Sequence, residues 1–348
     1  MGTADLLARA RAGDGEAIRE LAEPHRRELQ VHCYRMLGSV ADAEDAVQET
    51  MLAAWRGIGG FTRERASLRT WLYKIATSRC LNARRAASRR PARPWDMSQF
   101  EPPVPTPRDE AAWLQPFPDA LLDGAAGAPP GPEARYEQTE AISLAFVAAL
   151  QVLPPRQVAV LILRDVLGFR ASEVAGLLEV TVGSVNSTLK RARASLRHRQ
   201  QPAAGHPPPP AAGSPAEDAI VARFARAWQA ADLDALVALL TDDVFIAMPP
   251  EPFGYQGRDP VTRYCARQFG AGRRSDLVPA RANGQPAFGA YRRAPAGPRH
   301  ATAFYVLTLA GHQICALTRF EASVLPWFGL PRSLPSPPPA APGPAATG

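Results

Sequence analysis

Cysteine is scarce in this chain, and the few cysteines stand far apart. The 348-residue sequence holds four, at Cys33, Cys80, Cys265 and Cys315, and no two of them form a CxxC pair. This spacing argues against both a zinc motif and a disulfide framework. We therefore expect no metal site and no other cofactor, and we expect the protein to work in the reducing cytoplasm.

Long apolar runs are missing as well. No stretch reaches the roughly 18 consecutive apolar residues that indicate a transmembrane helix, and residues 1–16 lack the apolar centre of a signal peptide. We therefore expect no membrane association. Positive charge is present instead, with a formal net charge of +7 and a pI of about 9.6. This balance favours a polyanionic partner.

Proline is abundant, and its placement divides the chain. The 36 prolines gather in stretches without a sustained helical or strand period. The segment Trp113–Gly124 within one such stretch is too apolar for a plain linker, so we expect it to dock on another surface. We predict a helical domain over 1–90, a linker over 91–133, a second helical domain over 134–200, a linker over 201–215, a third domain over 216–330 and a disordered tail over 331–348.

The first block contains a helix with an acidic face. Ser39 is expected to cap it, and small and apolar residues recur at helical spacing from Ala43 to Ala54. Such a face is either solvated surface or a docking surface for a basic partner protein. Trp55, which closes the helix, is expected to pack in the core. The acidic face carries Asp42, Glu44, Asp45, Gln48 and Glu49.

Acidic residues are then absent between Glu64 and Asp96, while arginine and lysine recur throughout the interval. So dense a run of one sign is costly unless a polyanion neutralises it. Thr70, Tyr73 and Asn82 lie among the cations, as suits stacking and edge contacts on single-stranded nucleic acid. A basic surface helix with a core tryptophan is the alternative interpretation.

Residues 171–199 have the layout of a helix-turn-helix, with a scaffold helix over 171–178 and a second helix over 182–199. Short polar residues come first in the second helix and long cations later, which suits base contacts near its start and phosphate contacts further along. Glu179 stands where many such turns use glycine, and a positive φ there would cost about 1 kcal/mol. The exposed side of the second helix carries Ser184, Asn186, Ser187, Lys190, Arg191, Arg193 and Arg197.

The third block begins with helices and continues with alternating stretches that predict strands over 244–248, 277–283, 301–309 and 313–321. Its apolar residues either form an ordinary core or line a pocket. The obvious acid–base candidates are Asp242, Asp243, His300 and His312, which stand in no catalytic motif that we identify. The candidate pocket residues are Trp228, Met248, Tyr255, Tyr305 and His312.

The first block resembles region 2 of the extracytoplasmic-function sigma factors of bacterial RNA polymerase, through DAEDAVQETMLAAW and FTRERASLRTWLYKIATSRCLNARR. The resemblance implies that the acidic helix binds the clamp helices of the polymerase, through Asp42, Asp45, Gln48 and Glu49. It implies that the next helix reads and helps to melt the −10 promoter element. That role falls on Arg69, Trp71, Tyr73, Lys74, Arg79 and Asn82.

The later blocks extend the resemblance. LPPRQVAVLILRDVLGFRASEVAGLL is similar to region 4 of the same family, which implies that the second helix of the helix-turn-helix reads the −35 element as duplex DNA. The third block resembles the SnoaL-like, polyketide-cyclase-like α+β cone. That resemblance implies an apolar pocket and a small-molecule ligand.

We therefore expect a multidomain chain, with two all-α sigma domains, the second a helix-turn-helix, followed by an α+β SnoaL-like cone domain. We interpret it as a non-enzymatic sigma factor that binds core RNA polymerase and promoter DNA, with the C-terminal domain modulating its activity. One alternative is a ligand-sensing helix-turn-helix regulator, which would not need the acidic and basic first block. Another is a SnoaL-like enzyme fused to a DNA-binding module.

Overall fold

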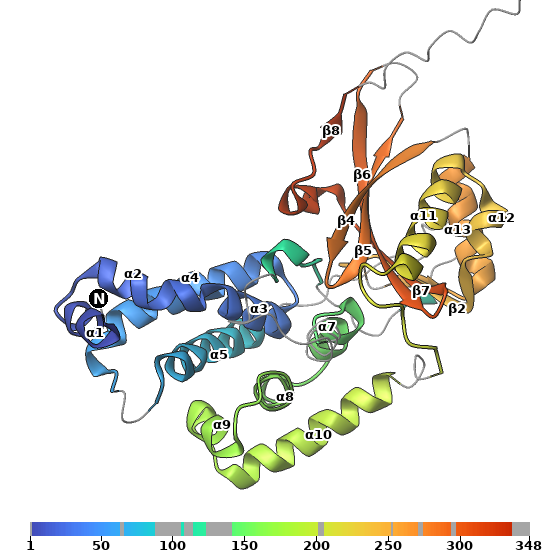
Figure 1. Ribbon diagram of the computed structural model, residues 1–348. Coiled ribbons are helices and arrows are strands. Elements are labelled where there is room, and N and C mark those ends of the chain that lie inside the picture. Colours follow the sequence, from blue (N-terminus) through green and yellow to red (C-terminus); the bar gives the residue numbers. More distant parts are fainter. Residues whose placement is uncertain are drawn as a thin grey trace, which may run out of the picture.

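In the computed structural model, two groups of helices lie beside a curved sheet that carries helices on one face (Figure 1). The structure describes residues 2–62, 66–87, 106–107, 114–122, 141–200, 205–251, 253–270, 274–293 and 297–335. Among these residues, no helix is long and apolar enough to span a membrane.

The helices of residues 2–87, here called the first module, have boundaries with local causes. Ser39 starts one helix by accepting a 3.1 Å hydrogen bond from the backbone N–H of Asp42. Gly38, at φ 73°, ends the helix before it in the left-handed conformation that glycine tolerates. The elements are α1 (Thr3–Arg11), α2 (Gly15–Ala22), η1 (Glu23–His25), α3 (Arg26–Leu37), α4 (Val40–Gly57), η2 (Ile58–Gly60) and α5 (Leu68–Ala87).

The helices of residues 141–200, here called the second module, form the predicted helix-turn-helix. The first helix of this module begins at Leu144, because the Ser143 side chain caps it by accepting from the backbone N–H of Phe146. Glu179 has φ 55°, so the turn does place a non-glycine residue in the left-handed region. The elements are α7 (Leu144–Gln151), α8 (Pro155–Leu161), η5 (Ile162–Val166), α9 (Ala171–Leu178) and α10 (Val182–Gln200).

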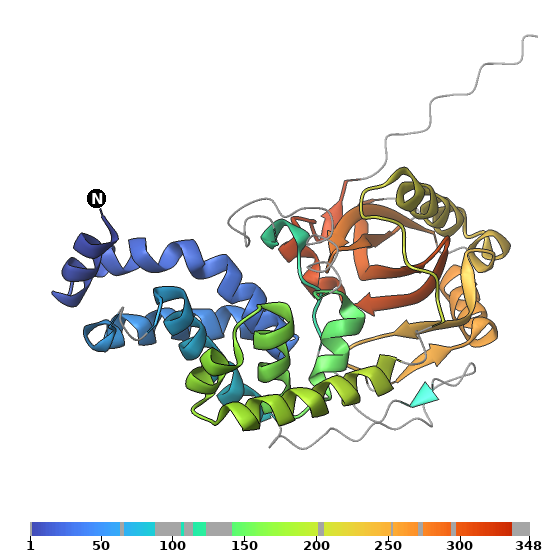
Figure 2. The ribbon, with the colours of Figure 1, turned by 60° about the horizontal axis from the view of Figure 1, so that its bottom comes forward.

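The sheet domain begins with the capped helix α11 (Pro215–Ala230), followed by α12 (Leu233–Val237) and, after two strands, α13 (Arg258–Phe269). The strands run in the order β1-β3-β2-β7-β6-β5-β4, with β8 paired to β6, and they curl around the helices (Figure 2). All pairs are antiparallel except β2 with β7. The strands are β1 (Thr106–Pro107), β2 (Leu240–Ala247), β3 (Phe253–Gln256), β4 (Ser275–Ala282), β5 (Gln285–Arg292), β6 (Arg299–Ala310), β7 (Gln313–Phe320) and β8 (Ser333–Leu334).

Several sequence expectations fail in this domain, and the short strand β3 is one element that was not predicted. Strand β5 was not predicted, because burial on both faces leaves it without the alternation that marks a half-buried strand. The predicted disordered tail over 331–348 includes β8, which pairs with β6 and is therefore ordered. Residues 336–348 lie outside the described residues.

Residues 114–122, here called the strut, join the first module to the sheet domain. The Gln115 backbone N–H donates to the carbonyl of Gly38 (2.8 Å), and its side-chain Oε1 accepts from the N–H of Val40 (2.9 Å) at the start of α4. Phe117 is 0% exposed and packs against Tyr34 with ring centroids 4.7 Å apart. The predicted docking of this segment is confirmed for these residues, on two surfaces of the same chain.

Asn283 lies where the strut, both modules and the sheet domain meet. It occupies the β4–β5 turn at φ 58°, a conformation that asparagine tolerates, and it is 0% exposed. Its Nδ2 donates to the Tyr34 hydroxyl (2.9 Å) and to the carbonyl of Ile142 (2.7 Å). Its Oδ1 accepts from the N–H of Phe117 (2.8 Å). One amide therefore satisfies buried groups of three other segments.

Two arginines of the first module hold the second module. Arg84 on α5 donates to the carbonyls of Leu150 (3.3 Å), Gln151 (3.1 Å) and Leu153 (2.9 Å), which lie at and just beyond the C-terminal end of α7. A cation at a helix C-terminus satisfies carbonyls that lack intrahelical partners. Arg35, 6% exposed, donates from Nε to the carbonyl of Ala141 (2.9 Å). The two modules are therefore packed together rather than merely linked.

His32 on α3 is buried within the first module. Its Nε2 lies 2.9 Å from the Thr77 hydroxyl, and its Nδ1 has no hydrogen-bond partner. Burial, with smaller contributions from Arg35 and Arg69, lowers the pKa of His32 from 6.5 to about 3. The folded protein therefore keeps this imidazole neutral, whereas the unfolded chain protonates it below about pH 6.5.

We expect the first module to lose stability as the pH falls from about 6.5 towards 3, because only the unfolded chain then binds the His32 proton. The loss is expected to reach about 2 kcal/mol at about pH 5. Urea unfolding followed by circular dichroism at several pH values measures it. His32→Gln should remove this part of the pH dependence, whereas the exposed control His312→Gln should keep it. An equal pH dependence in wild type and His32→Gln would contradict the prediction.

Candidate functional site

The acidic face of α4 is open to solvent. Asp42, Asp45, Gln48 and Glu49 are all exposed, and the ion pair that the described residues form on this face is a long one, 3.9 Å between Glu49 Oε2 and Arg79 Nη1 of α5. The carboxylates of the face therefore keep most of their capacity for an outside partner.

Two apolar side chains extend the acidic face, and the sequence reasoning missed them. Leu52 is 49% exposed and Trp55 is 50% exposed. The expectation that Trp55 packs in the core was wrong. Ala54 holds the buried position, and each successive residue turns about 100° around a helix, which carries Trp55 away from the core. Exposed large apolar residues beside a charged face often mark a protein interface.

The predicted −10 residues on α5 are not equally accessible. Asn82 is exposed, and Arg69, Trp71, Lys74 and Arg79 are half-buried. Tyr73 is 0% exposed. Its ring packs against His32 and against Phe169 of the second module, with centroids 5.0 and 5.4 Å apart. The prediction that Tyr73 stacks on a base is wrong for this conformation, because protein atoms cover its ring.

Two cations of α5, Arg69 and Lys74, each form an ion pair with a carboxylate. Arg69 Nε donates to Glu28 Oε2 (2.7 Å), and its guanidinium also lies 5.5 Å from the ring centroid of Phe169. Lys74 Nζ donates to Glu179 Oε1 (2.9 Å), across the interface between the modules. The hydrogen bond from Lys74 lowers the pKa of the Glu179 carboxyl. The contacts of Arg69 with Phe169 and of Lys74 with Glu179 therefore occupy side chains for which the sequence predicts a DNA contact.

Helix α10 differs from α5 in that its predicted DNA-binding side chains are open to solvent. Its seven predicted DNA contacts, Ser184, Asn186, Ser187, Lys190, Arg191, Arg193 and Arg197, are all exposed. Arg193 makes two hydrogen bonds to the Asp165 carboxylate, at 2.7 and 2.8 Å. Arg191 has only a 3.4 Å contact with the Thr188 hydroxyl. The sequence pattern did not reveal the Asp165 pairing, since the two residues stand 28 positions apart.

The sheet domain brings together four of the five predicted pocket residues. Trp228, Met248, Tyr255 and Tyr305 are at most 8% exposed and belong to one apolar cluster. His312 is exposed in the β6–β7 turn, so its predicted place in a pocket is wrong. A two-residue turn between antiparallel strands lies at the edge of a sheet, away from the interior.

The acid–base candidates of this domain lie on its exterior. Asp242 pairs with Arg258 at 2.9 Å and Asp243 with His206 at 3.0 Å. The remaining candidate, His300, is exposed, and its Nδ1 lies 2.9 Å from the Ser333 hydroxyl.

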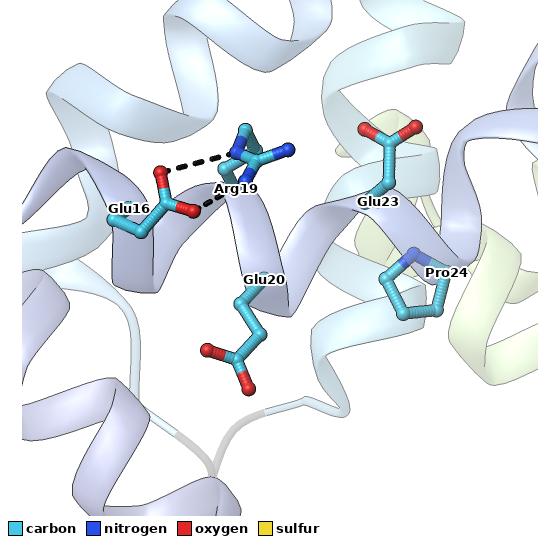
Figure 3. Close-up of a pocket in the computed structure, with 5 residues that line it drawn as sticks. All are labelled: Glu16, Arg19, Glu20, Glu23 and Pro24. Carbon is cyan, nitrogen blue, oxygen red and sulfur yellow. Dashed lines mark hydrogen bonds and ion pairs between the residues drawn. The ribbon is translucent and has the colours of Figure 1, made fainter.

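A surface hollow on the first module is also visible (Figure 3). It is lined by Glu16, Arg19, Glu20, Glu23 and Pro24, all of them exposed. Arg19 Nε donates a hydrogen bond to Glu16 Oε2, and this bond lowers the pKa of the Glu16 carboxyl. Among the described residues of the chain, no group of three or more His, Cys, Asp and Glu is placed to hold a metal ion.

Comparison with known proteins agrees with this architecture. The Sigma-70 region 2 model matches residues 21–90, the Sigma-70 region 4 model matches residues 143–196, and the SnoaL-like domain model matches residues 221–317. The ECF RNA polymerase sigma factor SigG of Mycobacterium tuberculosis is 41% identical over 322 residues, which cover 90% of this chain and 83% of the relative. The chain therefore belongs to the ECF RNA polymerase sigma factors, and it carries a SnoaL-like C-terminal domain.

Another relative matches little more than half of the chain, and one solved structure matches most of it. The ECF sigma factor SigM of Mycobacterium tuberculosis is 31% identical over 193 residues, covering 56% of this chain and 82% of the relative. The crystal structure of the Mycobacterium tuberculosis ECF sigma factor SigJ has the same fold, with a TM-score of 0.57 at 22% identity. It covers 87% of this chain and 96% of that one.

The contacts of α10 predict a difference between two neighbouring arginines. Arg191→Ala should weaken binding to promoter duplex and lower the slope of log affinity against log salt by about 1, because one phosphate contact is lost. Arg193→Ala should have a smaller effect, because Arg193 gives up its Asp165 contact in order to bind phosphate. Fluorescence anisotropy at several salt concentrations measures both slopes. Arg223→Ala, an exposed arginine of α11, is the control; a slope for Arg191→Ala equal to this control would contradict the prediction.

Proposed function

We propose that this chain binds core RNA polymerase through the acidic and apolar face of α4 and directs the enzyme to promoters through α5 and α10. The observation that carries the proposal is the division of labour along one chain. Helix α4 presents an exposed acidic face, α5 carries cations and an aromatic ring, and α9 and α10 form a helix-turn-helix whose second helix is exposed. A sigma factor of this kind works in the cytoplasm, where its polymerase is.

The polymerase contact is proposed for Asp42, Asp45, Gln48 and Glu49, together with Leu52 and Trp55. Charged rims steer encounter, while buried aromatic and aliphatic side chains supply most of the binding energy of an interface. The acidic residues of α4 provide the first property, and Leu52 and Trp55 provide the second.

The duplex contact is proposed for the exposed side of α10. Its N-terminal half offers Ser184, Asn186 and Ser187, whose short polar side chains suit base edges. Its later residues Lys190 and Arg191 suit phosphates. All of these side chains are exposed, so duplex DNA can reach them without any rearrangement.

The −10 contact on α5 requires a rearrangement. Phe169 of the second module covers Tyr73 and Arg69, and Glu179 of the same module holds Lys74. We therefore propose that the described arrangement is a closed state. In that state α10 is open to DNA while α5 is covered, and the two modules must separate before α5 engages a melted strand.

The sheet domain and the strut are proposed to hold the closed state. The strut binds the start of α4 through Gln115 and contacts the sheet domain through Asn283 and through Asp119, which accepts from the N–H of Gly284 at 2.8 Å. Asn283 also binds Ile142, where the second module begins. This arrangement supports a role for the C-terminal domain in restraining the sigma modules.

Charge reversal tests the polymerase surface. Asp45→Lys combined with Glu49→Lys should lower the affinity for core polymerase at least about tenfold, because a basic partner surface would then face like charge. Surface plasmon resonance with immobilised core enzyme measures this. Glu20→Lys combined with Glu23→Lys makes the same change of charge on the exposed hollow of Figure 3 and should leave the affinity unchanged. Equal effects of the two pairs would argue against the α4 surface.

Asn283→Ala tests the closed state. The change leaves the Phe117 N–H and the Ile142 carbonyl without their partner. It should weaken the packing of the strut and the second module on the sheet domain by about 3 kcal/mol. We expect a larger radius of gyration by small-angle X-ray scattering and a higher yield of run-off transcript at limiting core polymerase.

The control for this variant is Gln313→Ala, which removes an amide that donates to the Leu240 carbonyl (3.0 Å) inside the sheet domain. It should change neither measurement. An Asn283→Ala protein that opens without any gain in transcription would separate the structural role of Asn283 from regulation. A variant that stays closed would refute the role of this contact.

A further inference from the structure

The first residue of α10 exposes an apolar side chain. Val182 is 44% exposed, although it continues the apolar spacing of the helix towards its start. The other members of this spacing, Val185, Leu189 and Ala192, are at most 6% exposed and belong to the core of the module. A single exposed apolar residue is common on protein surfaces, so the neighbours of Val182 decide what it can do.

The next residue, Gly183, has no structural need to be glycine. It lies in the first turn of α10, and its φ is not positive, so other residues can adopt its conformation. A Cβ built on Gly183 would lie 4.0 Å from Thr181 Oγ1, which is an ordinary contact. Alanine would also stabilise the fold, because glycine has more conformational freedom in the unfolded chain. The close approach of another molecule to the backbone does require a residue without a side chain.

The backbone around Val182 and Gly183 is held in place. Thr181 Oγ1 accepts a 3.1 Å hydrogen bond from the N–H of Ser184 and so caps the helix. The N–H of Val180 donates to the Ala175 carbonyl (3.0 Å) and ties the turn to α9, at the lower edge of the view in Figure 1. A surface that is already ordered loses little conformational freedom when it binds a partner.

Short polar side chains surround the exposed valine. Ser184, Asn186 and Ser187 are all exposed, and Asn186 follows Val182 by four residues, which places both on the same side of the helix. The major groove of DNA presents hydrogen-bond donors and acceptors together with one apolar group, the C5-methyl of thymine. An apolar residue among short polar residues therefore matches a base edge that contains thymine.

We propose that Val182 contacts the C5-methyl group of a thymine in the promoter duplex. Gly183 allows the start of α10 to approach the base edges closely enough for this contact. The inference rests on the duplex contact proposed above for α10, and it adds the base that the start of the helix selects.

Deoxyuridine tests the contact, because it differs from thymidine in the base only by the missing methyl group. The full chain first selects duplexes from a random-sequence library, and each thymine of the selected duplex is then replaced in turn. At one position we expect the affinity to fall about fourfold, which is the contribution of one buried methyl group. Fluorescence anisotropy measures the affinities. The ratio between the two duplexes should be the same at low and high salt, because no phosphate contact changes.

Variants of Val182 assign the methyl contact to this side chain. Val182→Ala should bind the thymine and deoxyuridine duplexes equally, whereas Val182→Ile should keep the preference for thymine. Trp327→Ala is the control, because it removes an exposed apolar side chain, 38% exposed, from the sheet domain. It should discriminate between the two duplexes like wild type.

Gly183→Ala separates the role in binding from a role in folding. It should weaken duplex binding several-fold while raising the urea midpoint of unfolding. Gly176→Ala on α9 is the matched control, because Gly176 is an exposed helical glycine with open space around its Cβ position. It should raise the midpoint and leave duplex binding unchanged. Unchanged duplex binding by Gly183→Ala would refute the role of Gly183.

The outcomes distinguish this inference from the proposed duplex contact. Selected duplexes without thymine, equal binding of thymine and deoxyuridine at every position, or a preference that survives in Val182→Ala would each overturn the inference and leave the duplex contact standing. A Val182→Ala protein that binds duplex normally and core polymerase weakly would assign Val182 to the polymerase instead. A chain that selects no duplex would refute the duplex contact itself, and the inference with it.

Discussion

The Asn283 amide joins parts of the chain that the sequence keeps far apart. Its hydrogen-bond partners Tyr34, Phe117 and Ile142 stand 249, 166 and 141 residues away. The amide uses both donor hydrogens and its acceptor, and its site is closed to water. Moving any one part would leave a buried polar group unpaired, which costs more than a hydrogen bond gains. The relative placement of the two modules and the sheet domain therefore depends on this contact.

The ion pairs around the sigma modules have a different role. Arg69, Lys74 and Arg193 each hold a carboxylate, but all three side chains are partly exposed. Exposed ion pairs contribute little net stability, so phosphate can replace these carboxylates at small cost. The resistance to opening lies instead in buried contacts, such as Tyr73 on Phe169 and Arg84 on the end of α7. Under the proposed function, Arg69 and Lys74 would exchange these partners for phosphate once the buried interface between the modules has opened.

Several errors of the sequence reasoning have one cause. Trp55 was assigned to the core because it is aromatic, yet Ala54 fills the buried position of that helix turn. Tyr73 was assigned to DNA because cations surround it in sequence, yet it lies at 0% exposure against Phe169. His312 was assigned to a pocket, yet a tight turn carries it to the surface. Residue type suggests a role, but the neighbours of a side chain in space decide its exposure.

The sequence by itself determined the local features of this sigma factor. Helix caps such as Ser39, the helical spacing of α4 and the left-handed turn at Glu179 follow from short-range sterics and hydrogen bonds, so they can be read from neighbouring residues. Only the tertiary structure decided that the strut docks between two domains and that Asn283 binds the strut and both modules. Each of these depends on contacts between residues distant in the chain, which no local pattern encodes.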